Sequence, residues 1–251
     1  MKCTKDYFNS YFQQVNQSIV EMRSLLSSLL HLFYPHACEG CGTDLTSSEE
    51  ILCLTCQEKL PRTGYQHYPA NPVAKIFRGR ADISHAMAAY YYRKASLLQS
   101  LIYQFKYHNR RDVALQLGRQ TGYMLLQSKW LHEINCIIPV PLSKARERHR
   151  GYNQAALLAA GIAAVIKKPV ISHVLTRESY RSSQTNKNRI LRWENVEEAF
   201  SLQQAHVIRN QHVLLVDDVI TTGATTEACC QVLLQEKVNV SICCLAYANH
   251  S

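Results

Sequence analysis

The sequence predicts an α/β fold, in which a mostly parallel sheet is flanked by helices, preceded by a small cysteine module. Short apolar stretches alternate with stretches of helical periodicity from about residue 83 onward. One apolar stretch ends in two adjacent carboxylates, which a threonine-rich loop follows. Two Cys-x2-Cys pairs lie close together between residues 38 and 56. A chain of 251 residues has room for one α/β domain and one small module.

The composition is that of a globular protein with an uneven positive charge. Hydrophobic residues make up 47% of the chain and charged residues 19%, which argues against extensive disorder. The formal net charge is +9, and the basic side chains concentrate at residues 75–111 and 144–192. This excess favours phosphate-bearing partners, either phosphosugars or a nucleic-acid backbone. A solvated basic surface is the alternative for any one cluster.

We divide the chain into four parts. Residues 1–34 are expected to be helical, and Pro35 ends that pattern. Residues 35–62 form the cysteine module, residues 63–82 are predicted to be a proline- and glycine-marked linker, and residues 83–251 form the α/β domain. We expect a cytoplasmic protein without a transmembrane segment, because the start does not read as a secretory signal and no apolar stretch is long enough.

The α/β domain is predicted to alternate strands and helices in the following order. Strands are expected at residues 86–92, 136–140, near 174, 213–216 and 238–246. Helices are expected at residues 97–105, 113–126, 155–166 and 224–235. Asn153 is a suitable N-cap for the third of these helices.

The cysteine module predicts a structural zinc site. Its four ligands would be Cys38, Cys41, Cys53 and Cys56. Two-residue gaps let both thiolates of a pair reach one metal from a tight turn, which suits tetrahedral Zn²⁺. Four protein ligands leave no position for substrate, so the metal would be structural. Two disulfides or four unlinked buried cysteines are the alternatives, and the expected reducing cytoplasm disfavours disulfides.

The segment 212–226 carries the candidate ligand site. An apolar strand delivers Asp217 and Asp218 to its carboxyl end, where ligands bind in open α/β sheets. Backbone N–H groups at the start of the next helix can bind a phosphate, and Gly223 allows a close approach. The two carboxylates can hold a ribose diol and Mg²⁺.

Two other interpretations of this segment were considered. The Walker B strand of an ATPase would require a G-x-x-x-x-G-K-[ST] loop, which the chain lacks. A strand that merely ends in two exposed carboxylates before an ordinary helix start remains open, although it leaves the threonine-glycine pattern unexplained.

These residues resemble the phosphoribosyl pyrophosphate (PRPP) motif of type I phosphoribosyltransferases, in which an acidic pair precedes a T-T-G-x-T loop. Other segments are similar to one branch, the ComF family. They are residues 138–142 (IPVPL) with 150–154 (RGYNQ), residues 105–107 (FKY), and the spaced set Gln184, Arg192, Asn195 and Phe200. Asn109 stands where the family often has glycine, and asparagine also tolerates positive φ. The family has an N-terminal four-cysteine zinc module, so the resemblance covers the chain from about residue 30.

The resemblance implies a type I phosphoribosyltransferase fold and a role for each matching residue. Asp217 and Asp218 would be the catalytic pair that holds the ribose hydroxyls and Mg²⁺. PRPP would also lie on the loop made up of Val219, Ile220, Thr221, Thr222, Gly223, Ala224 and Thr225. Arg146 and Arg150, with Arg148 between them, are candidates for pyrophosphate, because guanidinium groups match phosphate oxygens.

ComF proteins are associated with natural transformation, which implies a role in the uptake or processing of single-stranded DNA. The expected partners are PRPP or a related phosphosugar or nucleotide, single-stranded DNA, and proteins of the DNA-uptake machinery near the inner face of the membrane. Lys106, Arg110 and Arg111 are candidate nucleic-acid contacts. Nearby aromatic residues such as Tyr103 and Tyr107 can stack on bases or belong to the core. A catalytically inactive, zinc-stapled interaction module is the alternative function.

Overall fold

The structure is a computed structural model that describes residues 37–46, 49–177 and 200–249. The helix expected at residues 1–34 lies outside the described residues, as do Gln184, Arg192 and Asn195. The chain forms two units, the N-terminal unit of residues 1–57 and the C-terminal unit of residues 58–251. In the N-terminal unit a short β-bridge joins Ala37 and Asp44, and helix α2 (Leu54–Glu58) lies at the boundary.

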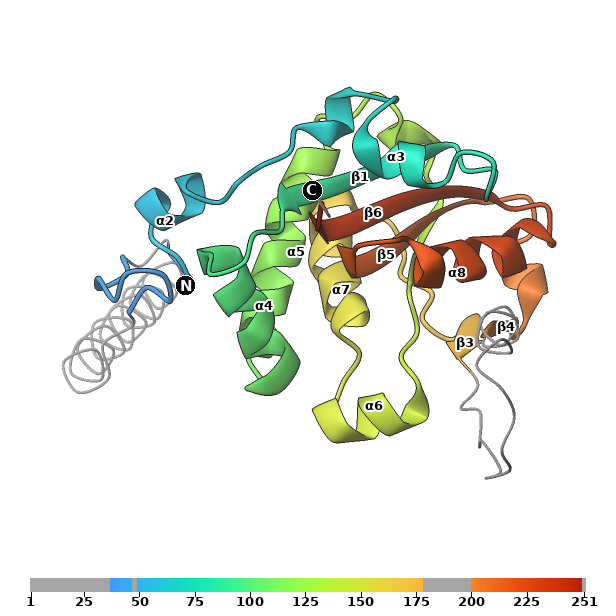
Figure 1. The fold of residues 1–251 in the computed structure, drawn as a ribbon. Coiled ribbons are helices and arrows are strands. Elements are labelled where there is room, and N and C mark those ends of the chain that lie inside the picture. Colours follow the sequence, from blue (N-terminus) through green and yellow to red (C-terminus); the bar gives the residue numbers. More distant parts are fainter. Residues whose placement is uncertain (1–36, 47–48, 178–199, 250–251) are drawn as a thin grey trace, which may run out of the picture. The chain divides into compact units, whose positions relative to one another are not determined.

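A four-stranded parallel sheet forms the centre of the C-terminal unit (Figure 1). Its order is β1 (His85–Tyr91), β6 (Asn239–Tyr247), β5 (His212–Ile220) and β2 (Cys136–Pro139). Leu215 of β5 lies opposite Ile138 of β2 and Ile242 of β6. All three side chains are buried, which is expected where helices cover both faces of a parallel sheet. The predicted parallel sheet is therefore confirmed.

Helices cover both faces of this sheet (Figure 1). Helices α5 (Arg111–Leu125) and α7 (Gln154–Ile166) pack on one face, and α8 (Ala224–Leu234) packs on the other. Helix α4 (Leu97–Tyr107) packs beside α5 and buries Leu98, Leu101 and Phe105. The Asn153 side chain accepts a hydrogen bond from the Ala155 N–H at 3.0 Å, as expected for the N-cap of α7. No helix among the described residues is long and apolar enough to cross a membrane.

The segment predicted to be a linker, residues 63–82, instead belongs to the folded C-terminal unit. It contains the 3₁₀ turn η1 (Tyr65–His67) and helix α3 (Pro72–Ile76). Val73 and Phe77 are almost fully buried. Pro72 occupies the first turn of α3 behind the N-cap Asn71, where its missing N–H costs nothing. Pro72 therefore marks the start of a helix and not a linker between domains.

Several further elements differ from the sequence prediction or were not anticipated. Helix α6 (Lys144–Arg150) begins behind Ser143 in a stretch for which no helix was expected. Strand β3 (Leu175–Arg177) pairs antiparallel with β4 (Phe200–Leu202) in a separate small sheet. Single 3₁₀ turns occupy η2 (Leu131–Glu133) and η5 (Ala205–Val207). Strand β5 continues four residues beyond its predicted end, because Asp217, Val219 and Ile220 still pair with β6.

Two glycines allow helices α5 and α7 to cross closely. A Cβ added at Gly118 of α5 would lie 2.5 Å from the backbone oxygen of Leu158 in α7. A Cβ added at Gly161 of α7 would lie 2.9 Å from the Gly118 Cα. Each Cβ would therefore collide with backbone atoms, which cannot rotate away as a side chain can.

Replacing Gly161 with alanine should destabilise the protein. Alanine favours a helix by about 1 kcal/mol over glycine, but separating α5 from α7 should lower the free energy of unfolding by about 1–3 kcal/mol net. Denaturant unfolding monitored by circular dichroism measures this change. The control Ala164→Val adds bulk on an exposed position of the same helix and should have a much smaller effect. A Gly161→Ala protein as stable as the wild type would contradict the crossing.

Candidate functional site

The acidic pair lies near the carboxyl end of β5. Successive residues of a strand face opposite sides of the sheet, so Asp217 and Asp218 meet different helices. Asp218 faces α4, where the Lys106 Nζ lies 2.5 Å from its Oδ2. The side chains of Lys106 and Asp218 are only 19% and 16% exposed. One carboxylate of the acidic pair, that of Asp218, is therefore already in contact with a cation, the Lys106 ammonium group.

Burial and mutual repulsion set the ionisation of the acidic pair. Burial and, as the second cause, the neighbouring Asp218 carboxylate raise the pKa of Asp217 to about 7. The Asp218 N–H, which donates to the Asp217 Oδ1 at 2.8 Å, acts in the opposite direction, as do Lys106 and the Thr226 hydroxyl. Two adjacent carboxylates with little access to water are both ionised only when positive charge lies close to them. Lys106 supplies that charge here, and a divalent cation coordinated by oxygen ligands would also supply it.

The predicted phosphate loop follows directly, although its first two residues, Val219 and Ile220, belong to β5. Thr221, Thr222 and Ala224 are exposed, and Thr225 is half-buried. No side chain caps the first turn of α8, an 11-residue helix, so its first N–H groups are not taken up by a side-chain cap. An uncapped helix start beside exposed hydroxyls is a suitable place for a phosphate group.

Gly223 is required at the start of α8 for two reasons. Its φ of 76° lies in the left-handed region, which residues with a Cβ rarely adopt. A Cβ there would also lie 2.7 Å from the Ile76 Cγ2 in α3. The backbone of the loop is therefore held close against the segment that follows residue 71.

Arg80 joins the segment after α3 to the loop and to α8. Its guanidinium donates a hydrogen bond to the Thr222 carbonyl oxygen at 2.9 Å and forms an ion pair with Glu227 of α8. Arg80 was not singled out in the sequence analysis, because its partners lie more than 140 residues away along the chain. The charge cluster at residues 75–111 was the one signal that included it.

The candidate pyrophosphate arginines have different surroundings. Arg146 and Arg148 are exposed on α6, and no described hydrogen bond or ion pair joins them to the acidic pair. Arg150 is half-buried, and its guanidinium donates to the Gln154 Oε1 at 2.9 Å. The same guanidinium lies over the Tyr107 ring, 5.4 Å from its centroid. The structure therefore brings Arg150 to α4, the helix that carries Lys106.

Each of the candidate nucleic-acid residues has a partner within the chain. Lys106 is paired with Asp218. Arg110 is paired with Asp112 at 2.7 Å. Arg111 lies over the Tyr152 ring, 4.8 Å from its centroid. Asn109 has the positive φ that the sequence analysis anticipated, 55°, so the turn after α4 is retained.

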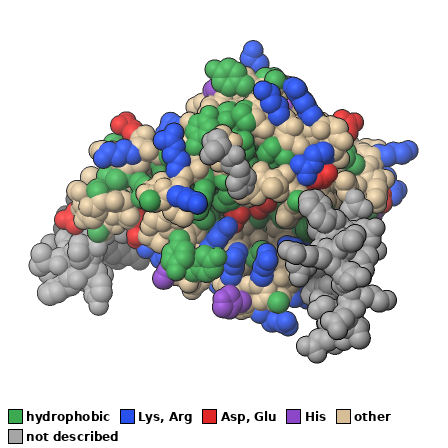
Figure 2. All heavy atoms as spheres, in the orientation of Figure 1, with side chains coloured by type: hydrophobic (Ala, Val, Ile, Leu, Met, Phe, Trp, Pro, Cys, Tyr) green, Lys and Arg blue, Asp and Glu red, His purple; other side chains and the backbone are tan. Residues whose placement is uncertain are grey.

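A cavity of about 300 Å³ lies next to the acidic pair. It is lined by Tyr92, Gln99, Ile102, Tyr103, Lys106, Tyr107, Val219, Thr221 and Ala248. On the face drawn in Figure 2, Lys and Arg side chains surround a small acidic patch. Gln99 and Ala248 were missed by the sequence analysis, because neither residue type signals a site.

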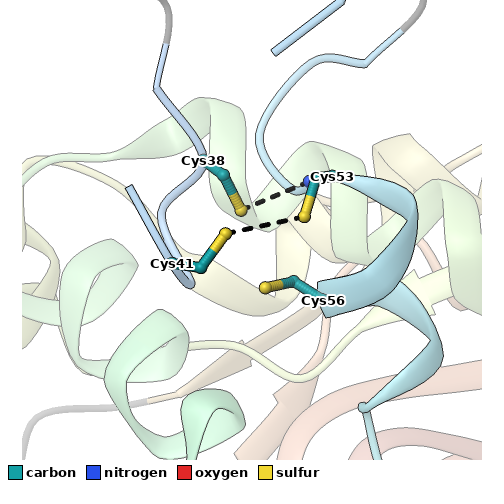
Figure 3. Close-up of side chains that lie close together, drawn as sticks. All are labelled: Cys38, Cys41, Cys53 and Cys56. Carbon is teal, nitrogen blue, oxygen red and sulfur yellow. Dashed lines mark hydrogen bonds between the residues drawn. The ribbon is translucent and has the colours of Figure 1, made fainter. Parts of the chain in front are cut away.

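The four predicted zinc ligands come together in the N-terminal unit. Figure 3 shows their sulfur atoms pointing toward one another. All four Sγ atoms lie within 4.8 Å of one another, and the Cys41 and Cys53 sulfurs are 3.7 Å apart. Zn–S bonds of about 2.3 Å at tetrahedral angles place sulfurs roughly 3.8 Å apart, so the cluster fits a zinc ion.

The surroundings of the sulfurs also suit thiolate ligands. The Cys38 Sγ accepts hydrogen bonds from the backbone N–H groups of Gly40 and Cys53, at 3.4 and 3.3 Å. All four cysteines are unbridged. Burial and then the neighbouring cysteine sulfurs raise the pKa of Cys56 to about 12. A bound divalent cation would reverse that effect, because it favours the thiolate form.

Comparison with known proteins places the chain in a family. A model of the phosphoribosyl transferase domain matches residues 153–251, which include β5, the loop and α8. The chain is 32% identical to the DNA utilization protein YhgH of Salmonella typhimurium over 226 residues, which cover 85% of this chain and 98% of that protein. It is 29% identical to competence protein F of Haemophilus influenzae over 208 residues, which cover 77% of this chain and 88% of that protein. The chain belongs to the ComF family.

Solved structures similar to this ComF chain include phosphoribosyltransferases of low identity. The glutamine PRPP amidotransferase of B. subtilis is 19% identical, with a TM-score of 0.38 over 56% of this chain and 30% of that chain. An adenine phosphoribosyltransferase is 18% identical, with a TM-score of 0.32 over 60% of this chain and 69% of that chain. The type I phosphoribosyltransferase fold follows from the family match together with the parallel sheet described above.

Purified protein should contain zinc equimolar with the chain. The double variant Cys41→Ser with Cys56→Ser should lose that zinc, because only two of four thiolates remain. Metal analysis by mass spectrometry measures the content of both proteins. The control Cys136→Ala removes a buried cysteine of β2 and should keep the metal. Stoichiometric zinc in the double variant would show that these cysteines are not the ligands.

Proposed function

We propose that this ComF protein binds PRPP with Mg²⁺ at the acidic pair and the loop that follows it, and that it serves the uptake or processing of single-stranded DNA. One observation carries the first part: an adjacent, poorly solvated carboxylate pair lies directly before an uncapped helix start. Such an arrangement offers a cation site and a phosphate site a few residues apart. The DNA-related role is supported by the names of the relatives, which are competence and DNA utilization proteins.

In this proposal each part of the site has its own task. Asp217 and Asp218 hold the ribose hydroxyls and Mg²⁺. The N–H groups at the start of α8 and the hydroxyls of Thr221, Thr222 and Thr225 hold the 5-phosphate. Mg²⁺, when bound, would neutralise charge on the diphosphate. Lys106 must then leave Asp218, and its ammonium group becomes available to the diphosphate oxygens.

Phosphoribosyl transfer is the reaction that such a site can support. The acceptor forms a bond to C1 of the ribose, the bond from C1 to the diphosphate oxygen breaks, and its electron pair leaves with the diphosphate. The protein contributes orientation and charge stabilisation, with no covalent step of its own. Of the candidate pyrophosphate arginines, Arg150 is the one that contacts α4, the helix that carries Lys106.

The cysteine cluster is proposed to bind a structural Zn²⁺. Four thiolates fill a tetrahedral metal, so no coordination position remains for a substrate. A catalytically inactive, zinc-stapled protein is the second candidate function. The Lys106–Asp218 ion pair favours it, because one of the two carboxylates already has a cationic partner without any ligand.

Titration of PRPP into the protein should show binding that requires Mg²⁺. The double variant Asp217→Asn with Asp218→Asn should weaken it by roughly 10- to 100-fold, because hydrogen bonds to charged groups contribute about 1.5–3 kcal/mol. Isothermal titration calorimetry measures both affinities. Glu236→Gln is the matched control, since its ion pair with Arg209 lies beyond the end of α8.

Two outcomes would count against the proposal. Metal-dependent PRPP affinity that survives in the double variant would remove the acidic pair from the site. A wild-type protein that contains zinc but shows no PRPP binding would favour the inactive interaction module. If PRPP binds, incubation with Mg²⁺ and a panel of bases and amines then tests for released pyrophosphate.

A further inference from the structure

We propose that the cavity between α3 and the start of β1 is a second ligand site, for a small phosphate monoester of a sugar, and that its occupant acts on the loop after β5. The cavity has a volume of about 730 Å³ and is lined by residues between Pro69 and His85. This volume lies within the range of small-ligand pockets. None of these lining residues belongs to the acidic pair or to the loop after it, so the site is separate from the one proposed for PRPP.

Arg78 supplies the positive charge for the phosphate group. The Arg80 N–H donates to the Phe77 carbonyl oxygen at 3.0 Å, which closes a turn with Arg78 exposed between them. The Arg78 guanidinium lines the cavity, and it forms no hydrogen bond or ion pair with any residue that the structure describes. A second guanidinium, that of Arg80, lines the same cavity. Guanidinium groups offer paired donors that match phosphate oxygens, so an anion fits this end of the cavity.

The other lining residues suit a hydroxylated body and a single phosphate. Asp82 and Ser84 are exposed and offer a carboxylate and a hydroxyl to the hydroxyl groups of a sugar. Phe77 and Ile83 supply apolar surface. The Asp82 carboxylate would repel a chain of phosphates, so the lining favours a small monoester over a nucleic-acid strand. Sugar phosphates and nucleoside monophosphates share this chemistry.

The fold holds both ends of the lining segment in place. The Asn71 side chain donates to the Ala86 carbonyl oxygen at 2.6 Å, which ties the start of α3 to β1. The Ser84 N–H donates to the Val240 carbonyl oxygen of β6 at 2.8 Å. The cavity is therefore formed before any ligand arrives, and binding does not have to order its walls.

Arg80 and Phe77 connect the cavity to the loop after β5. Both residues line the cavity. The Arg80 guanidinium also donates to the Thr222 carbonyl oxygen at 2.9 Å and pairs with Glu227. A Cβ at Gly223 would lie 3.3 Å from the Phe77 Cζ, so this ring separates the cavity from the loop. A phosphate in the cavity competes with the Thr222 oxygen for Arg80, because a guanidinium binds an anion more strongly than a carbonyl group. Occupation of the cavity should therefore loosen the loop.

Calorimetry on full-length variants tests the site. The probes are ribose 5-phosphate and adenosine 5′-monophosphate, with adenosine as the matched probe without phosphate and a thymidine oligonucleotide as the strand. Arg78→Gln removes the guanidinium that has no described partner. Lys75→Gln is the matched control, because it removes an exposed cation of α3 that does not line the cavity. Ala70→Trp fills the cavity from an exposed position and leaves the charge unchanged.

Arg78→Gln should bind the two monoesters roughly 10- to 150-fold more weakly than the wild type. Ala70→Trp should also weaken binding, whereas Lys75→Gln should bind as the wild type does. Tighter binding of adenosine 5′-monophosphate than of ribose 5-phosphate would identify a nucleoside monophosphate as the ligand, and the reverse order would identify a sugar phosphate.

Three results would overturn the site. The first is that neither monoester binds, including the case in which only the oligonucleotide depends on Arg78. The second is monoester binding that survives in both Arg78→Gln and Ala70→Trp, as expected of a ligand held at the loop itself. The third is adenosine binding as tight as that of its monophosphate.

Hydrogen exchange of the peptide that covers residues 221–227 tests the connection to the loop. At the same monoester concentration, exchange should be faster in the wild type than in Arg78→Gln, because the occupied cavity draws Arg80 from Thr222. Equal or slower exchange in the wild type would overturn the competition for Arg80.

These measurements do not depend on PRPP binding. Arg78-dependent monoester binding by a protein that fails to bind PRPP would keep the cavity site and remove the proposed phosphosugar function. Intact PRPP binding without any effect of Arg78 on the monoesters would remove the cavity site alone.

Discussion

The ion pair between Lys106 and Asp218 is the interaction on which the site depends. Two adjacent carboxylates lie where the sheet and its helices restrict water, and their ionisation requires a positive charge close by. Lys106, which lies on helix α4, supplies that charge. Because Lys106, Tyr103 and Tyr107 lie on this one helix, its position sets the acidic pair and the adjoining cavity together.

The loop after β5 is held by contacts from α3 and the residues that follow it. Gly223 lacks the Cβ that would collide with Ile76, and Arg80 joins the loop carbonyl of Thr222 to Glu227. These contacts come from the segment between residues 63 and 82, so that segment shapes the proposed phosphate site without containing any residue of the PRPP motif. A preformed loop of this kind binds a phosphate without first having to be ordered.

The sequence predicted those elements whose structure depends on residues close together in the chain. Buried parallel strands are apolar throughout, so β5 and β6 were visible in the sequence, and C-x2-C spacing identified the cysteine cluster. Partners distant in sequence were not predictable. Lys106 meets a carboxylate 112 positions later, so its charge alone gave no indication of that partner. Pro72 was ambiguous, because proline suits both a chain break and the first turn of a helix.

The cation position at the acidic pair links the fold to the proposed chemistry. If Lys106 occupies the place that Mg²⁺ takes, the two compete for the same carboxylates. The affinity of the ligand-free protein for Mg²⁺, measured by calorimetry for the wild type and Lys106→Met, tests this directly. Tighter Mg²⁺ binding by Lys106→Met is the predicted result. Equal or weaker binding would contradict the competition and show that the carboxylates are not the metal site.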